Sequence, residues 1–276
     1  NFKPDIAIYL DPRNVIIGCQ DTSPPIIISD NKFIDYIQMP VEEYVPTSFK
    51  LKNGKLFIGN LKGNPFLLDK NIVHEIMINS NGSYDCVWIT DDYLIVSGIY
   101  DSSVKLVHLN GREVNVIQRL DICYPYRFSP LVNNKVLLTC RGWHDRPGKV
   151  YLLKINLTKS DDCLVPSMEV LKEIIIPQSL FNLQRFLPSF VLNMNGFEKY
   201  NGYINDVSWF DYDNFVITTR NGNAIIILDL EGNIIQIIRI KNFRPTRFIG
   251  SRLPNEKVIF VDARQSRIME LSHNHL

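Results

Sequence analysis

Short runs of apolar, mostly β-branched residues recur along this chain and are separated by polar turns. One unit begins at Asp85-Cys-Val-Trp88, and a matching unit begins at Asp206-Val-Ser-Trp209. In both, a second apolar run, a polar turn and a third apolar run follow at nearly the same distances. Continuous apolar runs of about four to eight residues between turn signals are typical of strands covered on both faces. The pattern therefore predicts a series of antiparallel sheets.

The repeat extends over the whole chain when the units are aligned on the residue that opens each first strand. The opening residues are Asp5, Ser48, Asp85, Arg127, Asp206 and Arg247, and the second strands are predicted to begin at Asn14, Lys55, Tyr93, Lys135, Asn214 and Lys257. A recurrence of roughly 40 residues made of strand, turn and strand is the sequence sign of a β-propeller. We therefore predict an all-β fold, a six-bladed β-propeller of four-stranded antiparallel blades.

We expect residues 1–276 to form a single propeller domain. The predicted blades span approximately 5–40, 46–80, 83–120, 125–176, 203–240 and 244–272, with an insertion at 177–202. The long step between Arg127 and Asp206 leaves a seven-bladed ring as the alternative, although 177–202 is short for four further strands. Few residues follow Leu271, so either the last blade has three strands or residues upstream of Asn1 supply its fourth.

This repeat resembles the six-bladed propellers of the NHL, SMP-30 and TolB-like groups over essentially the whole chain. The resemblance rests on repeat architecture alone. The Gly-His and Trp-Asp dipeptides of WD40 proteins do not occur at blade spacing, and the sialidase Asp box and the kelch double glycine are absent. Because propellers host unrelated functions, the resemblance leaves the function open.

Composition limits the classes of partner. The chain has 30 basic and 29 acidic residues and a net charge of +1, so no general affinity for nucleic acid or anionic membranes is expected. No apolar stretch approaches the roughly 18 residues of a membrane span. The five cysteines include no Cys-x-x-Cys pair, and a large core does not need disulfides. These features favour a cytoplasmic chain over a secreted one.

Charged residues concentrate at one edge of the predicted blades. In an antiparallel blade the start of the first strand and the turn between the second and third strands lie at the same edge, so their side chains meet there. The candidate binding residues at this edge are Asp85, Arg127, Asp206, Arg247, Arg141, Trp143, His144, Arg146, Arg220 and Arg264. Charged groups at strand starts also commonly pair with their neighbours. Structural pairing, for example of Asp85 with Arg127, therefore stays open beside a ligand site.

The turn at 140–149 is longer than its counterparts and combines Trp143 and His144 with two arginines. Long polar loops on rigid scaffolds often bind partners, and Trp with Arg is frequent in binding hot spots. The alternative is a solvated hairpin tip whose Trp143 packs on its own blade. Trp88 and Trp209 occupy equivalent first-strand positions, where we expect them to pack between blades.

Two functions are consistent with these features. The first is a non-catalytic scaffold, without a cofactor, that binds a protein or an anionic ligand through this edge. The second, implied by the SMP-30 resemblance, is a divalent-metal-dependent hydrolase or lactonase with its site at the channel mouth. Its Ca²⁺ would be held by Asp85, Asn205 and Asp206.

The sequence departs from the enzyme pattern in two respects. Asp5 stands in the first-blade region where those enzymes carry a Glu, and Arg127 and Arg247 would repel a cation. No Ser–His–Asp or Cys–His arrangement can be assembled from the repeat. The sequence therefore favours the binding function, with a protein as the expected partner.

Overall fold

The computed structural model describes residues 4–19, 24–30, 32–70, 72–111, 113–141, 148–160, 163–176, 204–219, 224–239, 245–248, 258–262 and 267–271. All regular structure in these ranges is β-strand, which confirms the all-β prediction. In the same ranges, no helix is long and apolar enough to cross a membrane. The chain separates into two compact units, residues 1–126 and 127–276, and each is described by itself.

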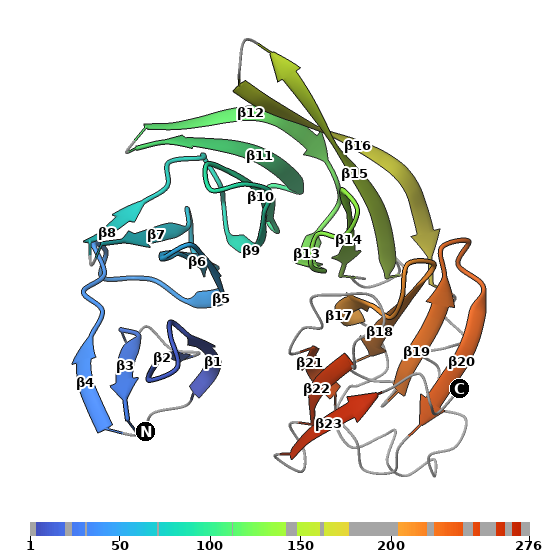
Figure 1. The fold of residues 1–276 in the computed structure, drawn as a ribbon, viewed down its shortest axis with the longest axis horizontal. Helices are drawn as coiled ribbons and strands as arrows, with labels where there is room; N and C mark the ends of the chain where they lie inside the picture. Colours follow the sequence, from blue (N-terminus) through green and yellow to red (C-terminus); the bar gives the residue numbers. More distant parts are fainter. Residues whose placement is uncertain are drawn as a thin grey trace, which may run out of the picture. The chain divides into compact units, whose positions relative to one another are not determined.

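The first unit contains three successive groups of four antiparallel strands (Figure 1). The first group is β1 (Pro4–Tyr9), β2 (Asn14–Cys19), β3 (Ile26–Ser29) and β4 (Lys32–Tyr36). The second is β5 (Pro46–Lys52), β6 (Lys55–Asn60), β7 (Phe66–Asp69) and β8 (Ile72–Glu75). The third is β9 (Ser83–Trp88), β10 (Tyr93–Gly98), β11 (Ser103–Asn110) and β12 (Glu113–Asp121). A pairing of Asn60 with Ser83 joins the second and third groups into one eight-stranded sheet.

The second unit continues the same order of strands. Its first group is β13 (Pro125–Phe128), which crosses the boundary between the units, β14 (Lys135–Cys140), β15 (Lys149–Ser160) and β16 (Cys163–Ile175). The next group is β17 (Ile204–Trp209), β18 (Asn214–Thr219), β19 (Ala224–Asp229) and β20 (Ile234–Arg239). The last described group has three strands, β21 (Pro245–Phe248), β22 (Val258–Asp262) and β23 (Arg267–Leu271).

The predicted second strands are confirmed to within one residue, since they begin at Asn14, Lys55, Tyr93, Lys135, Asn214 and Val258. The predicted insertion at 177–202 lies outside the described residues, and so does the room for a seventh blade. The number of blades and the single-domain organisation therefore stay predictions.

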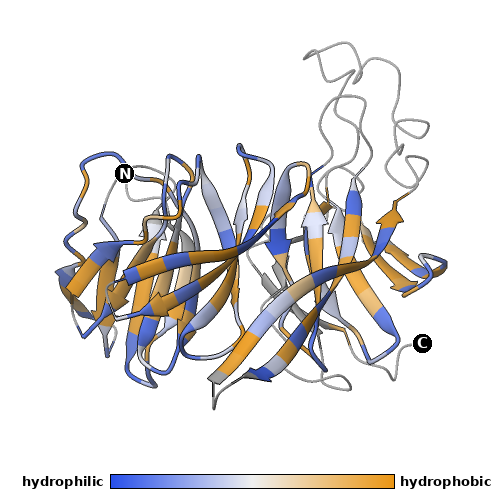
Figure 2. Cartoon of the chain, turned by 90° about the horizontal axis from the view of Figure 1, so that it is seen from above, coloured by the Kyte–Doolittle hydropathy of each residue, from blue (hydrophilic) through white to orange (hydrophobic). Residues whose placement is uncertain are grey.

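Burial follows the position of a strand within its group. β6, β10, β14 and β18 are buried at every residue after the first, whereas all five residues of outer strand β4 are exposed. Figure 2, coloured by hydropathy, shows orange apolar stretches along the strands and blue polar residues at many of the turns. Strands that are covered on both faces must be apolar throughout, which explains why their sequences do not alternate.

Two tryptophans at equivalent positions connect neighbouring strand groups. Trp88 of β9 is 8% exposed, and its Nε1–H donates to the carbonyl oxygen of Lys50 in β5 at 3.0 Å. Trp209 of β17 is 2% exposed, and its Nε1–H donates to the carbonyl oxygen of Pro130, just after β13, at 3.0 Å. A buried indole needs such an acceptor. The predicted packing of both residues between blades is confirmed.

We predict that Trp209→Ala lowers the free energy of unfolding by about 3–5 kcal/mol, as for other buried aromatic residues truncated to Ala. Urea unfolding followed by circular dichroism measures this loss. The matched control is Tyr212→Ala on the next turn, where the side chain is 50% exposed. The control should change stability by about 0.5 kcal/mol or less. Equal effects of the two substitutions would contradict the assigned packing of Trp209.

Candidate functional site

A β-bulge recurs at the strand-start edge, which we define as the edge of each group at which its first strand begins. The extra residue lies between Pro4 and Ile6, Pro46 and Phe49, Ser83 and Asp85, Ile204 and Asp206, and Pro245 and Arg247. Tyr84 is thus the bulged residue of β9, and Asn205 is that of β17. Bulges bend the strand and change the direction of its side chains, often beside binding sites.

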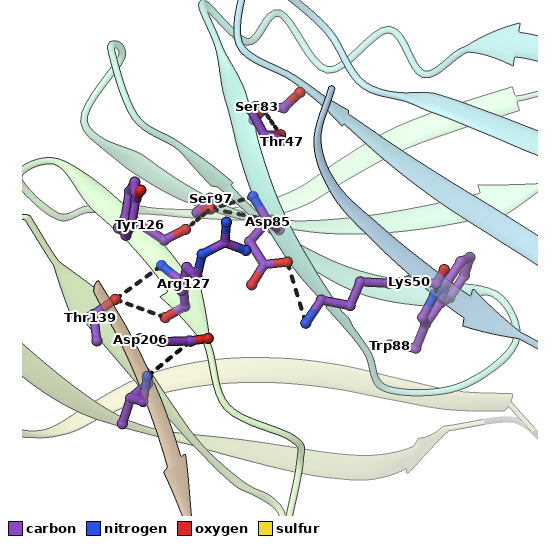
Figure 3. A network of polar contacts seen from close by, with 11 residues as sticks. Thr47, Lys50, Ser83, Asp85, Trp88, Ser97, Tyr126, Arg127, Thr139 and Asp206 are labelled. Carbon is purple, nitrogen blue, oxygen red and sulfur yellow. Dashed lines mark hydrogen bonds and ion pairs between the residues drawn. The ribbon is translucent and has the colours of Figure 1, made fainter. Parts of the chain in front are cut away.

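Hydroxyl groups satisfy the backbone at this edge. Ser97 Oγ accepts the N–H of Asp85 at 2.9 Å and lies 3.2 Å from the Asp85 carbonyl oxygen. In the second unit, Thr139 Oγ1 accepts the N–H of Arg127 at 3.1 Å and lies 3.3 Å from the Arg127 carbonyl oxygen. We call this arrangement the hydroxyl clasp. It fixes the backbone of two predicted site residues from the neighbouring second strand (Figure 3).

The clasp occupies the fifth position of the second strand, and this position differs between groups. It is Gly59 in β6, where an added Cβ would lie 2.2 Å from Thr47 Oγ1 and 2.8 Å from the Tyr84 carbonyl oxygen. There the hydroxyl comes from the first strand instead, since Thr47 Oγ1 donates to the Ser83 carbonyl oxygen at 3.1 Å. The fifth residue of β18 is Thr218, whose buried Oγ1 has no hydrogen-bond partner among the described residues.

Asp85 is buried at 1% exposure and forms an ion pair with Lys50 of the preceding strand group. The distance from Lys50 Nζ to Asp85 Oδ1 is 3.4 Å, and the Lys50 side chain is 36% exposed (Figure 3). A buried carboxylate needs such a counter-charge. Lys50 was not among the predicted site residues, because its position in β5 has no charged equivalent in the aligned repeat.

Cys86 follows Asp85 and lies in the apolar core of the third group. Burial raises the pKa of the Cys86 thiol well above its ordinary value, and the neighbouring Asp85 carboxylate raises it further. The thiol therefore stays protonated at neutral pH. Since the thiolate is the nucleophilic form of cysteine, this environment does not support nucleophilic chemistry at Cys86.

Turn charges at the same edge of the first unit are also ion-paired. Lys62 Nζ lies 2.9 Å from Glu43 Oε2, and buried Lys105 pairs with Asp101. Lys105 Nζ also donates to the Asn79 carbonyl oxygen at 2.9 Å, so it joins two connecting segments. These lysines are already neutralised by carboxylates of the same unit.

Tyr84 and Tyr126, each half-buried, form a second polar feature of the first unit. Their rings stack with centroids 4.0 Å apart and an interplanar angle of 28°. Their hydroxyl groups share a hydrogen bond of 2.5 Å. Sequence analysis missed this pair, although both tyrosines directly precede an aligned opening residue and that shared position was visible.

Four predicted residues of the second unit have described side chains. Arg127 and Asp206 are buried, at 6% and 7% exposure. Asp206 Oδ1 accepts the N–H of Val207 at 2.9 Å, which holds the carboxylate against its own strand (Figure 3). Asn205 and Arg141 are half-buried, and Arg141 directly follows β14.

The remaining predicted site residues are not tested. Arg247 lies on β21, but its side chain is not described, and Trp143, His144, Arg146, Arg220 and Arg264 lie outside the described residues. In the described part of the chain, no group of three or more His, Cys, Asp or Glu side chains is arranged to hold a metal ion. The proposed Ca²⁺ ligands belong to different units, Asp85 to the first and Asn205 and Asp206 to the second.

Comparison with solved structures identifies the fold. The β-propeller domain of Cps50 (Swd1) from Myceliophteria thermophila matches with a TM-score of 0.67 and 11% identity, over 94% of this chain and 80% of that chain. Virginiamycin B lyase from Staphylococcus aureus matches with a TM-score of 0.64 and 13% identity, over 98% and 84% of the two chains. The WD40 β-propeller domain of Doa1 gives a TM-score of 0.56 and 10% identity, over 99% and 94%.

These similarities show that the chain has a β-propeller fold, as its repeat predicted. At such low identity they show the fold alone, and they include a lyase as well as a WD40 domain. No protein-family model matches the chain, and no curated protein sequence matches it significantly. The site therefore has to be argued from its own residues.

The hydroxyl clasp generates a paired stability prediction. Thr139→Val should lower the free energy of unfolding by about 1–3 kcal/mol, because it leaves the buried N–H of Arg127 without its acceptor. Thr218→Val removes a buried hydroxyl that has no described partner, so it should be neutral or stabilising. Denaturant unfolding of both variants measures the difference, and a costlier Thr218→Val would show that the clasp does not hold this edge.

Proposed function

We propose that this chain is a non-catalytic propeller scaffold that binds a partner protein through the strand-start edge of its blades. The observation that carries the proposal is the construction of this edge, where bulges recur, hydroxyl groups hold the backbone of Asp85 and Arg127, and carboxylates pair with lysines of the first unit. Such an edge is fixed before the partner arrives, so little conformational entropy is lost on binding. Bulged residues such as Tyr84 and Asn205 give its surface irregular side-chain directions.

The ion pairing of lysines in the first unit favours a protein over a small anionic ligand. Lys50, Lys62 and Lys105 are each paired with a carboxylate, so an anion would have to displace an existing partner. A protein surface with charges of both signs complements a sign-mixed edge without this displacement.

The alternative is an SMP-30-like hydrolase or lactonase with Ca²⁺ held by Asp85, Asn205 and Asp206. The Lys50 ammonium group, 3.4 Å from Asp85 Oδ1, opposes a second cation at that carboxylate. The Asp206 carboxylate already accepts a backbone N–H. The arrangement of these residues thus fits a structural role better than a divalent-metal site.

We predict that Arg141→Glu abolishes capture of the partner, while Lys135→Glu retains it. The two residues lie at opposite ends of β14, Arg141 at the strand-start edge and Lys135 at the far edge. Proteins captured by the unaltered chain from an extract of its own cells are identified by mass spectrometry and compared between the variants. Loss in both variants, or in neither, would reject this edge as the binding surface.

Thermal melting with and without Ca²⁺ tests the alternative function. A ligand that binds only the native state raises its stability by mass action. We predict equal melting temperatures in millimolar Ca²⁺ and in excess chelator. A Ca²⁺-dependent rise of several degrees that disappears in Asp206→Asn would favour the metal-dependent enzyme and reject the scaffold proposal.

A further inference from the structure

A depression of about 410 Å³ lies at the strand-start edge of the first unit, lined mainly by the segment that connects β4 to β5. It is not one of the predicted site regions. Its apolar lining consists of Pro24, Met39, Pro40, Val41 and Tyr44, and its polar lining consists of Gln38 and Glu42. A mostly apolar wall with one carboxylate suits a ligand that carries both an apolar part and a positive charge.

The wall of this depression is held in place by the surrounding sheets. Tyr44 is 1% exposed and packs edge to face against Phe66, with ring centroids 6.2 Å apart. The backbone N–H of Ile37 donates to the Pro25 carbonyl oxygen at 2.8 Å, and that of Val45 donates to Asn60 Oδ1 at 3.1 Å. Both ends of the connecting segment are therefore anchored, and Pro40 restricts its backbone. The depression is formed before any ligand binds.

Glu42 differs from Glu43, Asp85 and Asp101, the carboxylates of this edge that are ion-paired. Its neighbour Glu43 pairs with Lys62 at 2.9 Å, and that hydrogen bond lowers the pKa of the Glu43 carboxyl group. Glu42 is exposed and forms no ion pair within the described residues. Among the described residues of the first unit, no cation pairs with the Glu42 carboxylate beside the apolar wall, whereas Asp85 and Asp101 are each paired with a lysine.

We propose that this depression binds an arginine side chain of the partner protein. An arginine buries an aliphatic stem while its guanidinium group stays at a polar rim, which matches Met39 and Val41 beside Glu42. The planar guanidinium donates several hydrogen bonds at once, and the Glu42 carboxylate and the Gln38 amide oxygen are acceptors of that kind. The inference rests on the proposed function only in taking the ligand to be a protein.

The experiment uses a peptide and a methyl group in the depression. The probe is acetyl-Gly-Leu-Arg-Leu-Gly-amide, and its control replaces Arg by citrulline, which has the same shape without the charge. The full chain, which contains five methionines, is labelled with ¹³C at the methionine methyl groups. The Met39 signal is assigned with Met39→Leu, and Met77, 60% exposed and not part of the lining, serves as internal control.

We expect the arginine peptide to shift the Met39 methyl signal in a saturable manner and to leave the Met77 signal in place. Citrulline should weaken binding by about two- to fivefold, as for a solvent-exposed ion pair. Glu42→Gln should weaken the binding of the arginine peptide by the same factor. Glu43→Gln should not change it, because Glu43 is already paired with Lys62.

An unmoved Met39 signal, equal binding of the two peptides, or equal effects of Glu42→Gln and Glu43→Gln would each overturn the proposal. A lysine peptide that binds more tightly than the arginine peptide would overturn the choice of arginine. If these results are negative while Arg141→Glu still loses the captured partner, this inference fails and the proposed function stands. If the peptide binds as expected while Arg141→Glu and Lys135→Glu capture the partner alike, the depression stands and the proposed binding edge fails.

Discussion

The inner strands of this protein are apolar on both faces, and this constraint governs the rest of its structure. A strand such as β10 or β18 cannot expose either face to water, so each strand group needs another group packed against it. The buried indoles make the packing specific, because Trp88 and Trp209 each require a carbonyl acceptor from the preceding group. Packing area alone would permit the groups to slide, whereas a hydrogen bond to one carbonyl fixes their register.

Lys50 joins this packing to the chemistry of the strand-start edge. Its carbonyl oxygen accepts the indole N–H of Trp88, and its ammonium group pairs with the Asp85 carboxylate. The main chain of Lys50 is thus held by the core, while its side chain neutralises a buried charge at the edge. Ser97 then binds the backbone of Asp85, so the residue is held by its main chain and by its side chain. An edge held in this way is suited to present a fixed surface.

The fold could be predicted from the sequence because apolar periodicity is a local signal that is repeated many times. The site could be predicted only in part, because the partner of a charge depends on register and bulges. The ion pair of Asp85 with Lys50 could not be predicted, because Lys50 has no charged equivalent in the aligned repeat, and the expected pairing of Asp85 with Arg127 stays a prediction. The bulge at Tyr84 shifts the register between β9 and β10 by one residue, and a periodic sequence pattern does not predict such a shift. Ser97 and Thr139 can be located in the sequence, but only the hydrogen bonds of the structure show that they hold the backbone of Asp85 and Arg127.

A repeat scaffold can specify a partner only where its copies differ, since equivalent positions offer a partner equivalent contacts. The fifth position of the second strand is glycine in β6 and a hydroxyl residue in β10, β14 and β18, so even the shared edge is not uniform. The segment that connects β4 to β5 departs further, because Pro40 stiffens it beside the apolar depression and Glu42 has no ion-pair partner among the described residues. Part of this segment is structural, since the buried side chain of Tyr44 packs against Phe66. The proposed arginine site therefore assigns partner specificity to a connection between strands, where the Glu42 carboxylate lies beside apolar surface.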